Sequence, residues 1–380
     1  MPKVVIIGGS YAGLGALSAI FKNSSSTLEV TVVAPSTHAY FNVVAPRLLS
    51  EPEKFEKTAV SIQDIVNKYD PSKASFVHGL VVSTDLENRK LSVKLIAGGV
   101  LDLEYDILVI ASGTEAKWKG YKVNQDYQDA RKAILSASKA LKDASSVAII
   151  GGGPTGVESA GEIAAEYKQA SVTLYTGSSG PLVSAAESLS AKATSKLQQL
   201  GVEIVNNVHV KSVIHDQPQE GATGAVDPES GATGSTVMLE NGEKSHYDLV
   251  LESYIVGPYS SFLPGSIKDD KGFVVTDGNL LVKGQHGVVA LGDIVAGSSK
   301  TYVDLKFRQM GIFSTTFSKL LQDTAETSES KYVPVTHTLL VPISRNGGVG
   351  IFYWIPLPNF IVWFGKARTY MIEKVMAGFV

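Results

Sequence analysis

Short runs of apolar residues, each ending in glycine or another small residue, recur along the chain. Residues 4–7 and 147–150 consist of Val, Ile and Ala, and each run leads into a glycine-rich turn and then a helical pattern. A continuous apolar run of this length is typical of a strand that is buried on both faces of a parallel sheet. Strands that alternate with helices predict an α/β protein.

Four further runs extend this pattern. Residues 30–33 and 172–175 are the strands expected after the two helices, residues 107–110 lead into Ala-Ser-Gly, and residues 288–291 lead into Gly-Asp. A helix is predicted after Gly-Asp, over about residues 304–321.

Two polar segments interrupt the pattern. Residues 216–236 are rich in Gly, Ala, Glu and Pro, and their flanks at 208–214 and 236–239 alternate between apolar and polar positions as strands do. We interpret this segment as a mobile hairpin insertion. Residues 322–331 are polar, and we place a domain boundary there.

The last 42 residues, 339–380, differ from the rest because they contain eight aromatic residues and are net basic. We expect a small sheet and helix that close an acceptor pocket. The same composition suits an apolar patch for a membrane or a dimer interface, and these alternatives stay open.

Composition narrows the function. The 380 residues are 44% hydrophobic and carry a formal charge of −3, so a disordered chain is excluded and a strongly basic nucleic-acid binder is disfavoured. Cysteine is absent, which excludes disulfides, thiolate nucleophiles, cysteine-ligated zinc and iron–sulfur clusters. The seven histidines have no metal-ligand spacing, and we predict no metal site. No apolar stretch reaches the roughly 18 residues of a membrane span.

The first glycine turn reads Gly8-x-Ser10-x-x-Gly13. In a dinucleotide site the first glycine permits the tight turn, the second position lets a pyrophosphate approach the backbone, and the third permits close packing of helix and strand. The N-terminus of the following helix attracts the phosphate charge. The strand 30–33 ends without the acid that normally binds a ribose, and Ser36 is a weaker candidate for that contact.

The second turn is a fuller match, Gly151-x-Gly153-x-x-Gly156, and it precedes Glu158. It predicts a second dinucleotide site. The strand 172–175 ends in Thr176-Gly177 with neither an acid nor a nearby arginine, so the choice between NADH and NADPH stays open.

The two fingerprints, the Ala-Ser-Gly turn and the late Gly-Asp, in this order, resemble the two-dinucleotide-binding flavoprotein reductases. The resemblance covers essentially the whole chain. Residues 40–47 and 344–350 resemble the AIF-like mitochondrion-associated (AMID) or ferroptosis-suppressor branch, which is related to type II NADH dehydrogenases. The lack of cysteine separates the chain from the dithiol reductases of the same superfamily.

This resemblance implies two Rossmann-like dinucleotide-binding domains and a small C-terminal α+β domain. Residues 1–115 and 250–325 are then the discontinuous FAD-binding domain, 116–249 the NAD(P)H-binding domain, and 326–380 the C-terminal domain. The chain departs from the family pattern at Ser10, Ala34 and Ser112, where Gly, an acid and Thr are more usual.

The resemblance also implies the site residues. The FAD pyrophosphate is assigned to the first turn, through Gly8, Gly9, Ser10, Ala12 and Gly13. The NAD(P)H pyrophosphate is assigned to the second turn, through Gly151, Gly153, Pro154, Thr155 and Gly156. The remaining FAD contacts are assigned to Arg47, Ala111, Ser112, Gly113, Gly292 and Asp293, and Tyr302 is expected to face the flavin.

The implied activity is transfer of a hydride from NADH or NADPH to FAD and of electrons to a quinone-type acceptor. Glu158 and Lys366 are the candidate catalytic residues that supply or relay protons. Glu158 is also expected to contact the cofactors, near the nicotinamide and the flavin. The plainer alternatives are a helix first-turn carboxylate and a solvated lysine beside an aromatic surface. A reductase of a specialised metabolite and a redox-responsive AIF-like binding protein are the alternative functions. We expect the chain in the cytoplasm or on a cytosol-facing membrane surface, with mitochondrial association as a further option.

Overall fold

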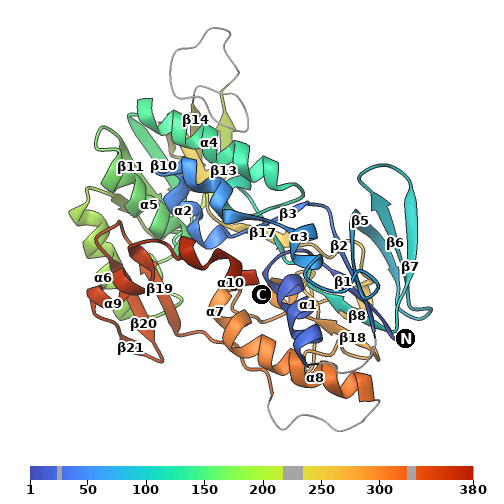
Figure 1. Ribbon diagram of the computed structural model, residues 1–380. Helices are drawn as coiled ribbons and strands as arrows, with labels where there is room; N and C mark the ends of the chain where they lie inside the picture. Colours follow the sequence, from blue (N-terminus) through green and yellow to red (C-terminus); the bar gives the residue numbers. More distant parts are fainter. Residues whose placement is uncertain (24–27, 217–233, 323–330, 380) are drawn as a thin grey trace.

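Two α/β units and a C-terminal segment pack together in the computed structural model, which describes residues 1–23, 28–216, 234–322 and 331–379 (Figure 1). The first unit is built on a seven-stranded sheet. In spatial order its strands are β18 (Val288–Ala290), β8 (Ile107–Ile110), β1 (Lys3–Ile7), β2 (Glu29–Ala34), β5 (Ala74–Asp85), β6 (Lys90–Leu95) and β7 (Val100–Glu104).

Strand β1 lies inside this sheet, parallel to β2 and β8, with Val4 opposite Val30 and Ile107. Residues 4–7 are all buried, as their continuous apolar run predicts. Strand β18 is parallel to β8, whereas β6 and β7 pair antiparallel to their neighbours. The carboxyl ends of β1, β8 and β18 therefore meet at one edge, where an open α/β sheet places its ligand.

The first unit also contains helices. They are α1 (Tyr11–Asn23), α2 (Ala45–Leu48), α3 (Ile62–Val66), α7 (Tyr302–Asp304) and α8 (Met310–Gln322), with a π-helical turn at Leu305–Gln309 between the last two. The helix predicted over 304–321 thus begins at Tyr302. The side-chain oxygen of Thr301 caps it by accepting a hydrogen bond from the Asp304 amide at 3.2 Å. Short strands β3 (His38–Tyr40) and β4 (Ala59–Ser61) pair beside α3.

The second unit is a four-stranded parallel sheet. Its strands, in spatial order, are β12 (Glu203–Val205), β11 (Ser171–Tyr175), β10 (Ser146–Ile150) and β16 (Leu249–Glu252). Its helices are α4 (Tyr127–Asp143), α5 (Pro154–Glu166) and α6 (Glu187–Gln199). Asp126 caps the N-terminus of α4, because its carboxylate accepts a hydrogen bond from the Gln128 amide at 3.0 Å.

Two smaller sheets accompany this unit. Strands β13 (Val210–His215), β14 (Ser235–Leu239) and β15 (Lys244–Tyr247) form an antiparallel sheet, so the strands predicted beside the polar insertion are confirmed. Residues 217–233 of the predicted insertion lie outside the described part. Strands β9 (Thr114–Ala116) and β17 (Ile255–Pro258) pair where the chain crosses between the two units. The domain boundaries stay predictions, and the one at 325/326 falls outside the described residues.

The C-terminal segment has the sheet and helix expected for it. Strands β19 (Thr338–Pro342), β20 (Gly348–Phe352) and β21 (Ile355–Pro356) form the sheet. Helix α9 (Asn359–Val362), a π-helical turn at Trp363–Ala367 and helix α10 (Val375–Phe379) follow. The observed architecture confirms the two-dinucleotide-binding α/β fold predicted from the sequence.

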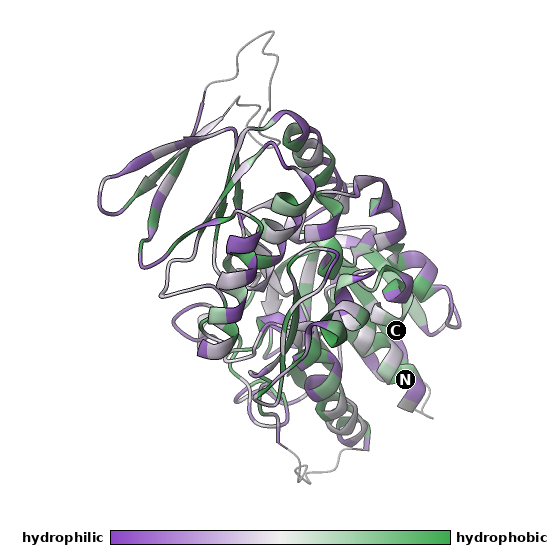
Figure 2. Ribbon diagram, turned by 90° about the vertical axis from the view of Figure 1, so that its left-hand side faces the viewer, coloured by the Kyte–Doolittle hydropathy of each residue, from purple (hydrophilic) through white to green (hydrophobic). Residues whose placement is uncertain are grey.

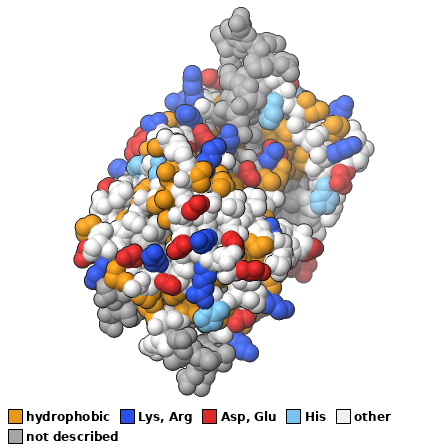
Figure 3. Space-filling view, turned by 90° about the vertical axis from the view of Figure 1, so that its right-hand side faces the viewer, with side chains coloured by type: hydrophobic (Ala, Val, Ile, Leu, Met, Phe, Trp, Pro, Cys, Tyr) orange, Lys and Arg blue, Asp and Glu red, His pale blue; other side chains and the backbone are white. Residues whose placement is uncertain are grey.

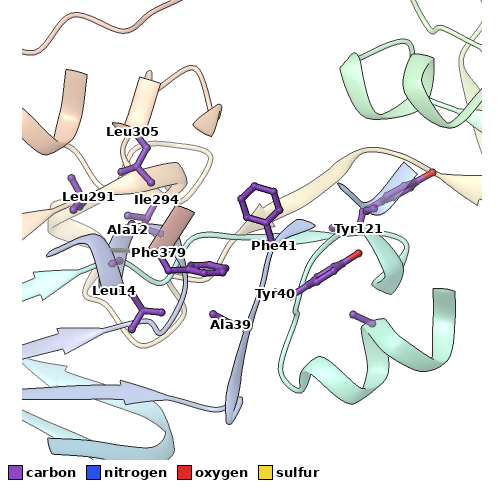
Figure 4. Packing of buried hydrophobic residues seen from close by; sticks show 14 of the residues in the cluster. Ala12, Leu14, Ala39, Tyr40, Phe41, Tyr121, Leu291, Ile294, Leu305 and Phe379 are labelled. Atoms are coloured by element: carbon purple, nitrogen blue, oxygen red, sulfur yellow. The ribbon is translucent and has the colours of Figure 1, made fainter. Parts of the chain in front are cut away.

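The hydrophobic core continues from the first unit into the C-terminal segment. Phe379 of α10 is fully buried, and its ring centroid lies 4.9 Å from that of Tyr11. It also lies 6.2 Å from the ring centroid of Phe41 (Figure 4). Hydrophobic and hydrophilic residues alternate along the helices (Figure 2), as is typical of helices that bury one side. Acidic and basic side chains are interspersed on the face shown in Figure 3, in keeping with the small net charge.

Candidate active site

The first glycine turn is closed by backbone contacts that only glycine permits. Gly8 has φ +121°, and a Cβ there would lie 2.2 Å from the Ala111 carbonyl oxygen. A Cβ on Gly13 would lie 1.8 Å from the Gly8 carbonyl oxygen. The turn therefore sits directly on the strand end at Ala111, and the exposed Ser10 stands at the start of α1. This is the close-packed turn that a dinucleotide site requires.

The other predicted contacts of the first unit divide into two groups. Gly292 lies against Ala12, since a Cβ on Gly292 would be 2.8 Å from the Ala12 methyl group. The Gly-Asp turn and the start of α1 are thus brought together. The Ser112 hydroxyl, in contrast, donates to the Tyr259 carbonyl at 2.6 Å, and the Ser36 hydroxyl donates to the His38 carbonyl at 2.8 Å. Both hydroxyl protons are therefore used inside the protein.

Asp293 has a partner that the sequence did not indicate. The Lys122 ammonium group lies 2.5 Å from Asp293 Oδ2 and also donates to Thr114 Oγ1 at 2.6 Å. Asp293 and Lys122 are each about a quarter exposed. Three lysines occur within six residues here, at 117, 119 and 122, and nothing in the local pattern distinguishes the one that reaches the Gly-Asp turn.

Tyr302 and Gln309 lie on the helix that follows Gly-Asp. Tyr302 is partly buried, and its ring centroid is 5.3 Å from that of Tyr11, at the start of α1. Gln309 is buried, and its side-chain oxygen accepts from the Gly292 amide at 2.6 Å. Gln309 therefore holds the Gly-Asp turn, while Tyr302 packs against the start of α1.

The second glycine turn repeats the first. Gly151 has φ +123°, and a Cβ on Gly156 would lie 1.9 Å from the Gly151 carbonyl oxygen. A Cβ on Gly153 would meet nothing within 4 Å. Gly153 and Pro154 are exposed at the N-terminus of the 13-residue helix α5, with Thr155 beside them. The open space over this helix end suits a pyrophosphate.

Glu158 and Lys366, 208 residues apart in sequence, are brought together. The Lys366 ammonium group donates to Glu158 Oε1 at 2.6 Å. Glu158 is 3% exposed and lies in the second turn of α5, whereas Lys366 comes from the π-helical turn of the C-terminal segment. Burial raises the pKa of Glu158 to about 7; Lys366 opposes this rise and the neighbouring Glu162 adds to it. A carboxyl group that titrates near neutral pH can hold or release a proton at the working pH.

The guanidinium of Arg47, which was expected to contact the flavin or its phosphates, is hydrogen-bonded to other residues of the protein. It donates to both oxygens of Glu162, at 2.7 and 3.0 Å, and to the Ala367 carbonyl at 3.0 Å. Its charge is therefore matched by Glu162 within the protein. The contact of Arg47 with the flavin or its phosphates stays a prediction.

The two glycine turns and the helices that follow them fit two dinucleotides. In each unit a strand, a turn whose glycines a Cβ would obstruct, and a helix N-terminus come in the required order. Both strands that normally carry a ribose-binding acid end without one, at Ala34 and Thr176. No group of three or more His, Asp or Glu residues able to hold a metal ion occurs in the described ranges.

This arrangement defines an α/β enzyme with two dinucleotide sites and a buried acid–lysine pair between the second site and the C-terminal segment. The chain belongs to the pyridine nucleotide-disulphide oxidoreductase family, whose model matches residues 2–311. It is an NAD(P)H-dependent flavoprotein oxidoreductase with FAD as its cofactor. Because the chain has no cysteine, it lacks the disulphide after which the family is named.

Three relatives illustrate the breadth of the family. Oxidoreductase ptaL of Pestalotiopsis fici is 29% identical, with 95% of this chain and 94% of the relative covered. Ferroptosis suppressor protein 1 of Xenopus tropicalis is 26% identical, with 98% and 94% covered. A type II NADH:quinone oxidoreductase of Staphylococcus saprophyticus is 24% identical, with 80% and 85% covered. The predicted relationship to these last two groups is confirmed.

The fold itself has close counterparts among solved structures. NDH2 from Plasmodium falciparum in complex with NADH superposes with a TM-score of 0.69 at 16% identity, covering 100% of this chain and 96% of that one. No helix in residues 1–23, 28–216, 234–322 or 331–379 is long and apolar enough to cross a membrane.

Proposed function

We propose that the protein is an FAD-dependent NAD(P)H:quinone oxidoreductase, in which Glu158 and Lys366 handle the protons. The observation that carries this proposal is the buried Glu158–Lys366 pair, which joins the helix of the nicotinamide site to the C-terminal segment. The similarity to a type II NADH:quinone oxidoreductase of Staphylococcus saprophyticus supports quinone as the acceptor class. When bound, FAD supplies the two-electron chemistry that links NAD(P)H to the acceptor.

The protein's residues would hold the cofactors as the fit of the two turns indicates. Gly8, Ser10 and Gly13 would receive the FAD pyrophosphate, and Asp293 would accept hydrogen bonds from the ribityl chain. Gly151, Gly153 and Gly156 would receive the nicotinamide dinucleotide. The N-terminus of the helix that begins at Tyr302 would favour negative charge beside it.

Reduction of a quinone to a quinol takes up two electrons and two protons, so a proton donor must stand near the acceptor. Glu158 is suited to this because its raised pKa, about 7, leaves a protonated population at neutral pH. Lys366 binds the ionised carboxylate at 2.6 Å and thereby stabilises it after the proton has left. Because Oε1 accepts the bond from Lys366, Oε2 is the oxygen left to carry the transferable proton, and the carboxylate can be reprotonated there after each proton has left.

A comparison of two acceptors tests this role. Ferricyanide takes electrons without protons, whereas a short-chain ubiquinone needs both. We expect Glu158→Gln to lower turnover with the quinone by about 10²-fold and to leave ferricyanide reduction nearly unchanged. Equal effects on both acceptors, or none, would remove Glu158 from proton transfer. Reduction by NADH without any quinone-dependent reoxidation would overturn the proposed function.

A second candidate function is oxidoreduction of another organic acceptor. It is favoured by the 29% identity to a relative named only as an oxidoreductase. Turnover with a panel of enones and aldehydes, but not with quinones, would support it. A long-lived reduced complex that no acceptor reoxidises would instead favour a redox-responsive binding protein.

We further propose that the C-terminal segment rests on a membrane surface, where lipid quinones reside. Phe360 and Phe364 are 68% and 69% exposed, and Tyr353, Trp354 and Ile355 add to the same apolar hairpin and helix. The Arg368 guanidinium lies 5.3 Å from the Phe364 ring centroid, so a cation borders the patch and suits anionic lipid. A cytosol-facing or mitochondrial membrane would serve, and a homodimer is the competing use of the patch.

Vesicle sedimentation tests this surface. We expect Phe360→Ser combined with Phe364→Ser to abolish binding to phosphatidylcholine–phosphatidylserine vesicles. Val100→Ser is the matched control, because Val100 is also 68% exposed but lies on β7, at the opposite side of the molecule (Figure 1). The patch would instead be assigned to self-association by two results together. The double variant would lose dimers in light scattering, and its vesicle binding would equal that of the wild type, whether or not the wild type binds.

A further inference from the structure

Arg47 is the largest fully buried side chain of the described residues, at 1% exposure. It belongs to α2 in the first unit, yet all its strong hydrogen bonds leave that unit. Two go to Glu162 of α5, at 2.7 and 3.0 Å, and one goes to the carbonyl of Ala367 in the C-terminal segment, at 3.0 Å. Arg47 therefore joins three separate parts of the chain.

Each partner of Arg47 is adjacent to one member of the Glu158–Lys366 pair. Glu162 is one helical turn after Glu158 on α5, so their side chains share a face. Ala367 follows Lys366 directly and ends the same π-helical turn. π-helical turns are frequent at functional sites, where they displace one side chain from the regular helix path.

The ring of Tyr370 contacts both the Arg47 guanidinium and the Lys366 ammonium group. Its centroid is 4.7 Å from the Arg47 guanidinium carbon and 5.4 Å from the Lys366 ammonium nitrogen, and the ring is fully buried. Both cations therefore contact one aromatic side chain. A shift of Arg47 would be transmitted to Lys366 through the Ala367 backbone and through this ring.

Further charged residues lie around Arg47, beyond the contacts with Glu162 and Ala367. Glu51 Oε1 lies 3.6 Å from Arg47 Nη1, and Arg345 and Lys54 both pair with Glu51. Arg345 is half exposed and also approaches Glu166 at 3.8 Å. These outer pairs reach solvent, whereas Arg47 and Glu162 do not.

We propose that Arg47 is a positioning residue that fixes the separation of Glu158 and Lys366 by binding Glu162 and the Ala367 carbonyl at the same time. This inference rests on the proton role proposed for the pair. Arginine suits the task because its planar fork can serve a carboxylate with two parallel bonds and still donate to a carbonyl. Lysine offers a single ammonium nitrogen in place of the fork.

An infrared pH titration of the FAD-loaded protein tests the proposal without turnover. The carbonyl band of a protonated carboxylic acid reports Glu158, and Glu158→Gln identifies which band belongs to it. Arg47→Lys keeps the charge and loses the fork, so Lys366 is no longer held against Glu158. We expect the midpoint of the Glu158 band to rise by about one pH unit, because a displaced Lys366 stabilises the ionised carboxylate less well.

Arg131→Lys is the matched control, because the partly exposed Arg131 on α4 also pairs with a glutamate, Glu56. We expect it to leave the Glu158 midpoint unchanged. A lowered unfolding temperature in Arg47→Lys with the wild-type Glu158 midpoint would reduce Arg47 to a structural role and overturn the proposal.

A second comparison covers the case in which Arg47→Lys does not fold. Glu162→Gln and the double variant Arg47→Lys/Glu162→Gln both lack the carboxylate at position 162 and both keep a cation at position 47. We expect a higher Glu158 midpoint in the double variant than in Glu162→Gln, since only the double variant loses the guanidinium fork that donates to the Ala367 carbonyl. Equal midpoints would contradict the proposal. Absence of quinone turnover would defeat the proposed function alone, because the infrared midpoints do not depend on an acceptor.

Discussion

Lys122 and Asp293 form an ion pair that ties the start of the second unit to the Gly-Asp turn of the first, with Nζ 2.5 Å from Oδ2. The two residues are 171 positions apart. The carboxylate that the family resemblance assigns to the FAD ribityl chain is thus neutralised by a lysine from outside the FAD motifs. An anionic cofactor can then approach this carboxylate at a smaller electrostatic cost.

Removal of Lys122 should weaken FAD binding. Lys122→Met leaves Asp293 without its cation beside an anionic cofactor, and we expect the FAD dissociation constant to rise roughly fivefold. This corresponds to about 1 kcal/mol, at the upper end for a partly exposed pair. Flavin fluorescence titration of the deflavinated protein measures the constant. Lys117→Met, at an exposed lysine of the same segment, should leave it unchanged. Equal binding in Lys122→Met would show that the pair contributes nothing to FAD affinity, and tighter binding would show that it opposes FAD.

The second glycine turn separates folding from nucleotide binding. A Cβ on Gly153 meets nothing, so Gly153→Ala should fold normally, load FAD and raise the KM for NADH by about tenfold or more. A Cβ on Gly156 strikes the Gly151 carbonyl oxygen, so Gly156→Ala should lose more than about 2 kcal/mol of unfolding free energy. Urea unfolding and steady-state kinetics on both variants check this. The prediction fails if Gly153→Ala keeps the wild-type KM.

The end of β11 offers control of nucleotide choice. Gly177 has φ +67°, a conformation that Asp and Asn tolerate better than other residues, and the His209 ring lies 3.4 Å from the position of an added Cβ. Gly177→Asp should lower kcat/KM for NADPH relative to NADH by about tenfold, because its carboxylate repels the 2′-phosphate. Gly177→Asn has the same shape without the charge and should leave the ratio near wild type. The same ratio in both variants would exclude this strand end from the ribose site.

Glu158 should make stability depend on pH. Its folded pKa, about 7, exceeds the ordinary value of 4.5, so the folded state binds the proton more tightly than the unfolded state does. The resulting stabilisation is complete below pH 4.5 and is lost as the pH rises through 7. At about 1.4 kcal/mol per pH unit it amounts to at most about 3 kcal/mol.

Urea unfolding between pH 4.5 and 8 measures this dependence. The difference in unfolding free energy, wild type minus Glu158→Gln, should fall as the pH rises, because all other titrating groups are shared. A difference that stays constant across this range would mean that Glu158 keeps its ordinary pKa in the folded protein.

The strands and glycine turns could be predicted from the sequence because their signals are local. An apolar run of four residues followed by glycines at fixed spacing describes contacts made within one strand–turn–helix unit, such as that of Gly13 with the Gly8 carbonyl five residues earlier. Glu158 and Lys366 were found through the family resemblance, which compares whole chains and so spans the 208 residues between them.

The partners of Arg47 and Asp293 could not be predicted in this way. A buried arginine needs an anionic partner. A cofactor phosphate and many carboxylates of the chain are possible partners, and the sequence does not indicate which of them Arg47 binds. In the structure the partner is Glu162. The two π-helical turns were also missed, because a π turn differs from an α turn by one residue and leaves the hydrophobic spacing almost unaltered. Contacts between units depend on how the units dock, which local patterns do not encode.

The strand order of the first sheet has a consequence for folding during synthesis on the ribosome. Strand β18 pairs with β8 in this sheet, although 177 residues, including the whole four-stranded sheet, separate Ile110 from Val288. Translation at about 5–20 residues per second therefore delivers the last strand roughly ten to forty seconds after its neighbour. Until then the outer edge of β8 is unpaired and open to wrong partners. A chaperone that shields this edge, or slow codons placed after β16, would be expected to raise the yield of protein that can take up FAD.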